Sequence, residues 1–234
     1  IYPMIIQSDN IKEIDNLMKL FPQEVLMAFN MDITSLNSVF GWIKSEGFIF
    51  ALLIIASYAG IMGSNILLKE ENDKTIEYLI SLPVTRRKIV ISKIVCGWLY
   101  LIFMVLVFAT FNYIGLSLSG TFDIKEFILL SITPFFSSLV IFSFCMFLST
   151  FTNKTKKMIG ISLGVVFVSY MLQVLSTLSN QVEFLKYISV FTLSDIRNVI
   201  LNIEINPSLV IVSFLLTFLF SIMTIVRYDS KELV

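Results

Sequence analysis

The sequence predicts an all-α polytopic membrane protein with five transmembrane helices. Hydrophobic residues make up 56% of the 234 residues and charged residues only 15%, which is too apolar for a water-soluble domain of this size. Five runs contain no Asp, Glu, Lys or Arg, and each reaches the roughly 20 residues that a helix needs to cross the hydrocarbon core. Backbone polar groups in lipid must be bonded within their own segment, so each run is expected to be helical. The expected spans are about 47–68, 94–118, 127–151, 158–178 and 207–226.

Residues 1–46 precede the first of these spans and are expected at the outer surface of the membrane. Between Ile11 and Phe21, apolar residues recur at helical spacing among charged ones, which is typical of an amphipathic helix on a membrane surface. A start on the outer side without a cleavable signal is most simply explained by one further span upstream. We therefore expect six spans in the full chain, with residues 1–234 forming a single transmembrane domain.

The basic residues predict how the spans are oriented. Loops on the cytoplasmic side of a membrane protein carry an excess of Lys and Arg. One side would hold residues 69–93, 152–157 and the C-terminus, with eleven basic residues, and the other side only six. Residues 69–93 and the C-terminus are therefore expected in the cytoplasm, and residues 179–206 are expected as an outer loop. We expect a multi-pass protein of the plasma membrane, of bacterial origin.

Small residues in two of the spans indicate close helix packing. In the first span Ala56, Gly60 and Ser64 are four residues apart, and Gly160 and Gly164 repeat this spacing in the fourth span. Such spacing lets a neighbouring helix approach closely. The neighbour is either another subunit or a helix of the same chain, and the sequence leaves both open.

Pro134 interrupts the third span. It cannot donate a backbone hydrogen bond, so a kink is expected there, with the hydroxyls of nearby Ser and Thr residues bonding to the freed carbonyls. A bent helix with a polar face could line a transport path. Hydroxyl groups bonded back to the backbone of an ordinary helix are the alternative.

Residues 69–93 form a charged interruption between the first two spans. Ile76, Leu79, Ile80 and Pro83 follow the spacing of an apolar helix face, with charged residues on the other faces. This predicts a short amphipathic helix over residues 73–83, ended by the proline. Thr85 can then cap a second helix that runs into the next span. Its basic residues are expected to anchor the span at the inner interface: Arg86, Arg87, Lys88 and Lys93.

This loop carries a resemblance to a known family. The run Glu70-Glu71-x-x-x-Thr75-Ile76-Glu77-x-Leu79-Ile80-Ser81-x-Pro83-Val84-Thr85-Arg86 resembles the cytoplasmic signature of ABC-2 type ABC transporter permeases. The resemblance implies six spans and a coupling helix that sits in a cleft of a separate ATP-binding subunit. It assigns that contact to Glu70, Glu71, Asp73, Lys74, Thr75, Ile76, Glu77, Leu79, Ile80 and Pro83. Members usually have glycine where this chain has Lys74.

Several classes of function lack the residues they require. The chain has no histidine, its two cysteines lie in apolar runs, and no metal-ligand spacing is present, so we assign neither catalytic nor metal-binding residues. A net charge of zero gives no electrostatic footprint for nucleic acid. No phosphate-binding Gly-x-x-x-x-Gly-Lys-Ser/Thr loop occurs, so ATP and magnesium would be bound by the partner subunit.

The favoured hypothesis is the permease subunit of an ATP-driven exporter. Two copies of the chain, or two related permeases, would enclose a path within membrane lipid. Its apolar composition favours an amphipathic peptide, an antibiotic or another drug as substrate. Export of sodium or of another small solute is an alternative. So is a non-transporting membrane scaffold or sensor that recruits a cytoplasmic protein through the same loop.

Overall fold

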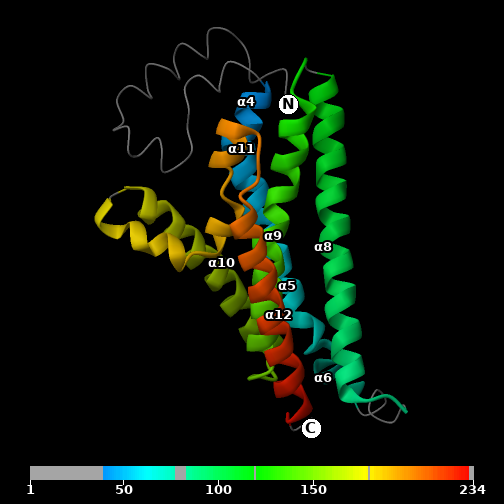
Figure 1. Cartoon of the computed structure of the whole chain (residues 1–234). Coiled ribbons are helices and arrows are strands. Elements are labelled where there is room, and N and C mark those ends of the chain that lie inside the picture. The colour runs from blue at the N-terminus through cyan, green and yellow to red at the C-terminus, as the bar shows by residue number, and fades with distance from the viewer. Residues whose placement is uncertain (1–38, 77–82, 119, 179, 232–234) are drawn as a thin grey trace.

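The computed structural model describes residues 39–76, 83–118, 120–178 and 180–231, and every structural statement below refers to these ranges. They are helical and contain no β-strand. Five helices are long and apolar enough to cross a membrane. They confirm the expected all-α polytopic fold (Figure 1): α5 (Phe48–Ile66), α8 (Arg86–Ser117), α9 (Ile124–Ser149), α10 (Thr155–Leu178) and α12 (Pro207–Asp229). The amphipathic helix expected near Ile11 lies outside the described residues.

Polar residues set where several helices begin. The hydroxyl of Thr85 accepts a hydrogen bond from the backbone N–H of Lys88, so α8 starts at Arg86, as the expected cap predicts. The carboxylate of Asp123 caps α9 in the same way. Two short elements precede α5 in the chain: α4 (Val39–Trp42) and then one π-helical turn, η2 (Ile43–Gly47).

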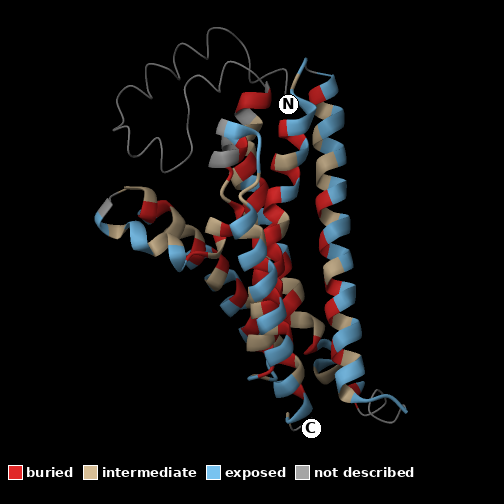
Figure 2. Cartoon of the chain, in the orientation of Figure 1, coloured by how far each residue is buried: buried red, intermediate tan, exposed pale blue. Residues whose placement is uncertain are grey.

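Helix α9 is the central helix of the bundle. It lies between α5, α8 and α12, and buried residues concentrate along it (Figures 1 and 2). Phe142 of α9 is fully buried between Gly63 of α5 and Gly97 of α8. A Cβ atom at Gly63 would overlap the backbone carbonyl of Phe142, and one at Gly97 would overlap its ring. Both neighbouring helices therefore approach α9 as closely as they do because these positions lack side chains.

The small residues of α5 pack inside the chain. Ala56 and Ser64 are fully buried, and a Cβ on Gly60 would lie 3.4 Å from the Cβ of Ser162 in α10. Gly160 and Gly164 differ from this arrangement. Both lie on the exposed face of α10, where an added Cβ would meet no atom within 4 Å.

The segment expected as an outer loop folds back against the helices. It contains two 3₁₀-helices, η3 (Asn180–Tyr187) and η4 (Val190–Ser194), and the short α11 (Arg197–Asn202). The hydroxyl of Ser189 donates to the carbonyl of Ser169 in α10 at 2.7 Å, and Phe191 and Leu193 are buried. Serine hydroxyls bonded to helix carbonyls take the place of water, so part of this loop lies within the bundle.

Pro134 lies where η4 meets α9, about 15 Å along the helix from its start at 1.5 Å per residue. The hydroxyl of Ser194 donates to the carbonyl of Thr133 at 2.8 Å and accepts from the amide of Ser137 at 3.3 Å. Ser138 donates back to the carbonyl of Pro134 at 2.7 Å. Ser138 thus bonds back within α9, and Ser194 bonds α9 from η4. The role of Pro134 in a transport path stays a prediction.

The contact of Gly63 with Phe142 gives a first prediction. Gly63→Ala forces a methyl group against the backbone of α9 and should lower the free energy of unfolding by about 1–3 kcal/mol, the usual cost of overpacking. Thermal unfolding of the purified chain in detergent measures this.

Gly160→Ala is the matched control, because that glycine is also helical but has open space around it. It should leave stability unchanged or raise it by up to about 1 kcal/mol, since alanine favours helix. Equal destabilisation by both variants would contradict the assigned packing.

Candidate functional site

The charged loop begins at the end of the bundle that carries the C-terminus (Figure 1). Leu67 and Leu68, both fully buried, turn the chain out of α5 into the short helix α6 (Lys69–Asn72). After α6 the chain turns through Asp73 and Lys74. Burial of the two leucines fixes where α6 leaves the bundle.

Lys74 has a left-handed backbone with φ of 56°. Glycine adopts this conformation without a steric penalty, whereas a side chain opposes it. Glycine at this position belongs to the signature that the loop resembles, and the left-handed backbone of Lys74 gives a physical reason for it. In this chain the turn is held by backbone hydrogen bonds from Lys74 to Glu71 and from Thr75 to Glu70.

The helix that was expected over residues 73–83 does not begin at residue 73 in the structure. Asp73 and Lys74 belong to the turn, and Ile76 is the first helical residue after it. Ile76 is only 4% exposed, so its side chain packs on the chain itself. Glu77, Leu79 and Ile80 lie outside the described residues, and Pro83, at the far end of the loop, is exposed.

Glu71 forms a buried ion pair with Lys231, which follows α12. The Lys231 ammonium lies 2.8 Å from the carboxylate, and the two side chains are 9% and 5% exposed. The same ammonium donates to the carbonyl of Thr152 at 3.3 Å. This one cation therefore joins α6, the end of α12 and the connection between α9 and α10.

Glu70 forms a second ion pair, with Lys93 of α8. The Lys93 ammonium also donates to the carbonyl of Ile66 at the end of α5, at 2.5 Å, and its side chain is only 14% exposed. Lys93, which was expected as an anchor at the inner interface, joins α8 to α5 and α6, because the carboxylate beside it replaces water around the ammonium.

The first residues of α8 bind the end of α12. Arg86 donates to the carbonyl of Lys231 at 3.0 Å, and Arg87 forms an ion pair with Asp229 at 2.9 Å. Lys88 is exposed, and its role as an interface anchor stays a prediction. Of the four expected anchors, three therefore contact other parts of the chain.

These contacts define what we call the charged junction: Glu70, Glu71, Arg86, Arg87, Lys93, Asp229 and Lys231. The sequence analysis did not find the roles of Asp229 and Lys231. Two opposite charges just beyond the last span were the available signal, but sequence spacing does not identify partners about 140–160 residues away.

The charged junction joins the loop to the bundle through charged side chains. Among the described residues no group of three or more His, Cys, Asp or Glu side chains is placed to hold a metal ion. The ion pairs connect the loop to the ends of α5, α8 and α12. Displacement of the loop would therefore be transmitted to three spans at once.

A double-mutant cycle tests the buried pair. Glu71→Gln and Lys231→Met each leave a buried charge without its partner, and each should lower the free energy of unfolding by about 3–5 kcal/mol. The double variant should lose less than the sum of the two. Thermal unfolding of the purified chain is the measurement.

The pair formed by Arg87 and Asp229 is the control, since its side chains are 69% and 36% exposed. Arg87→Gln and Asp229→Asn should each cost less than about 1 kcal/mol. Equal losses for the two pairs would show that burial of Glu71 and Lys231 does not set the strength of their interaction.

Comparison with known proteins identifies the family. A family model described as "ABC-2 family transporter protein" matches residues 7–233. Neither a curated protein nor a solved structure shows a significant match. The matched range contains all five long helices, the loop and the charged junction. The chain therefore belongs to the ABC-2 family of transporter proteins, and it is a multi-pass membrane subunit of an ABC transporter.

Proposed function

We propose that this chain is the permease of an ATP-driven exporter and that residues 70–83 couple it to the ATP-binding subunit. The observation that carries the proposal is the position of the family's signature loop. The loop leaves the bundle through α6, which two ion pairs fix, and returns into the continuous helix α8. A subunit that pushes on this loop would act on the ends of three spans.

The distribution of basic residues supports a cytoplasmic location for the loop and the C-terminus. Eleven of the seventeen basic residues lie at this end of the expected topology. ATP is a cytoplasmic substrate, so the ATP-binding subunit has to dock on this side. We place the chain in a bacterial plasma membrane with its C-terminus inside.

The coupling contact is expected to centre on the residues that follow the turn. Glu70 and Glu71 are engaged within the chain and Ile76 is buried, so these three hold the loop in place. Glu77, Leu79 and Ile80 remain the proposed direct contacts, with Pro83 ending the helix. Asp73, Lys74 and Thr75 are exposed and complete the surface offered to the partner.

Energy would come from the ATP-binding subunit, because this sequence has no phosphate-binding loop. ATP and magnesium belong to that subunit in our proposal. A second permease, identical or related, would complete the path. The substrate class that suits the apolar composition is an amphipathic peptide, an antibiotic or another drug.

Two substitutions in the loop test the coupling. Leu79→Asp places a charge on the apolar face and Glu77→Lys reverses a charge beside it. Each should reduce ATP-dependent transport in vesicles by about tenfold or more, which corresponds to a loss of only about 1.4 kcal/mol of docking free energy. Co-purification of the ATP-binding subunit should weaken in parallel.

Lys125→Glu is the control, because it reverses an exposed charge at the opposite end of the bundle. It should leave transport and co-purification unchanged. Normal transport in both loop variants would refute the coupling role. Partner binding without movement of peptide, drug or sodium would favour a scaffold instead of a transporter.

A further inference from the structure

A basic pocket lies beside the charged junction, where the end of α5 and α6 face the connection between α9 and α10. Its volume is about 770 Å³. Its lining includes a single acidic residue, Asp73, and four lysines: Lys69, Lys154, Lys156 and Lys157. All four are exposed, and none forms an ion pair within the described residues. With four lysines against one carboxylate, the pocket carries a clear excess of positive charge.

The walls of this basic pocket are joined to each other. The side-chain amide of Asn72 in α6 donates to the hydroxyl of Thr155, the first residue of α10. Lys156 and Lys157 belong to the first turn of α10, whose backbone N–H groups lack partners within the helix and add to the positive potential. The lysines therefore surround a fixed opening, although they come from segments about 85 residues apart in the sequence.

A second pocket continues from the basic one between α5 and α8, and we call it the apolar pocket after its lining by Tyr58, Met62, Cys96 and Tyr100. Its volume is about 590 Å³. Its other lining residues are Asn65, Ile66, Lys69, Glu70, Ser92 and Lys93, of which Glu70 and Lys93 form an ion pair with each other. The two pockets share Asn65 and Lys69. Tyr58 lies seven residues before Asn65, which corresponds to about 10 Å along α5 at 1.5 Å per residue. The combined groove runs from a charged surface into the apolar part of the bundle.

We propose that this groove binds an anionic phospholipid. The phosphate headgroup would lie among the four lysines, and an acyl chain would follow the apolar pocket between α5 and α8. Basic pockets between membrane-spanning helices suit anionic headgroups. A free phosphate ion would leave the apolar part of the groove empty, whereas a phospholipid matches both parts.

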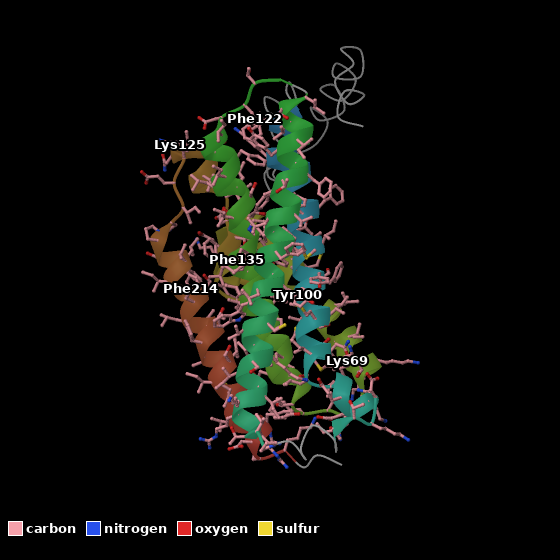
Figure 3. All side chains as sticks on the ribbon, turned by 90° about the vertical axis from the view of Figure 1, so that its right-hand side faces the viewer. Lys69, Tyr100, Phe122, Lys125, Phe135 and Phe214 are labelled. Carbon is pink, nitrogen blue, oxygen red and sulfur yellow. The ribbon has the colours of Figure 1, made fainter. Side chains whose placement is uncertain are left out.

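The position of the groove also favours lipid over a protein partner. Figure 3 shows Lys69 at the side of the bundle and Tyr100 farther along the same side, on α8. Tyr58 and Tyr100 are 40% and 54% exposed, so the apolar pocket opens toward the surroundings of the spans. The inference concerns lipid binding alone and stands whether or not the loop couples ATP hydrolysis to transport.

Lipid titration of the purified full chain, followed by native mass spectrometry, tests the proposal. Dioleoyl phosphatidylglycerol should bind about tenfold or more tightly than dioleoyl phosphatidylcholine, since only the first carries net charge. Replacing all four lysines by glutamine should remove this preference. Replacing them by arginine should keep it, which separates loss of charge from misfolding.

Further variants distinguish the two parts of the groove. Met62→Trp fills the apolar pocket and should weaken binding of dioleoyl phosphatidylglycerol more than that of the dihexanoyl form. Lys125→Gln removes an exposed lysine at the opposite end of the bundle and should leave lipid binding unchanged. Inorganic phosphate should compete only weakly.

Three results would overturn the proposal. The first is an unchanged preference for phosphatidylglycerol in the four-glutamine variant. The second is full competition by inorganic phosphate at lipid concentrations, which would identify a soluble anion as the ligand. The third is normal lipid binding combined with loss of the ATP-binding subunit from the four-glutamine variant, which would identify the lysines as a protein-docking surface.

Discussion

The position of Phe142 between Gly63 and Gly97 is the packing constraint on which the rest of the bundle depends. Lipid tails are as apolar as leucine, so helices in a membrane associate through close packing rather than through the hydrophobic effect. Gly63 lets α5 approach the backbone of Phe142, and Gly97 lets α8 approach its ring. With α9 surrounded, the other long helices bury only one face each and present the remainder to lipid or to another subunit.

The charged junction follows from this packing. Once α5 and α8 are fixed on α9, Lys93 lies beside the end of α5, where both the Ile66 carbonyl and Glu70 reach it. Lys231 is similarly fixed against Glu71 by the course of α12. Burial of an ion costs several kcal/mol and is compensated only by good geometry, so the ion pairs require a rigid bundle beneath them. The loop is therefore held by the same contacts that hold the spans together.

Local features of the fold could be predicted from the sequence, and long-range contacts could not. The spans follow from length and composition, and Thr85 marks the start of α8, because these signals lie within one segment. The sequence analysis missed the hydrogen bond from Ser194 to the Thr133 carbonyl, next to Pro134. A stretch of mixed polarity is typical of an ordinary loop, and its sequence does not show that a hydroxyl bonds to α9. Within the candidate site, the signature residues were found by resemblance. The partners of Glu70 and Glu71 were not found, because a charge pattern does not specify which charged side chains far apart in the sequence form ion pairs.

The turn at Lys74 gives the loop a mechanical property. On its near side, ion pairs hold α6 rigidly to the bundle, and on its far side a long helix begins at Arg86. A left-handed backbone at a residue with a side chain costs about 1–2 kcal/mol. The backbone hydrogen bonds from Lys74 to Glu71 and from Thr75 to Glu70 hold the residue in this conformation despite that cost. The loop therefore stores conformational energy at the point where it leaves α6.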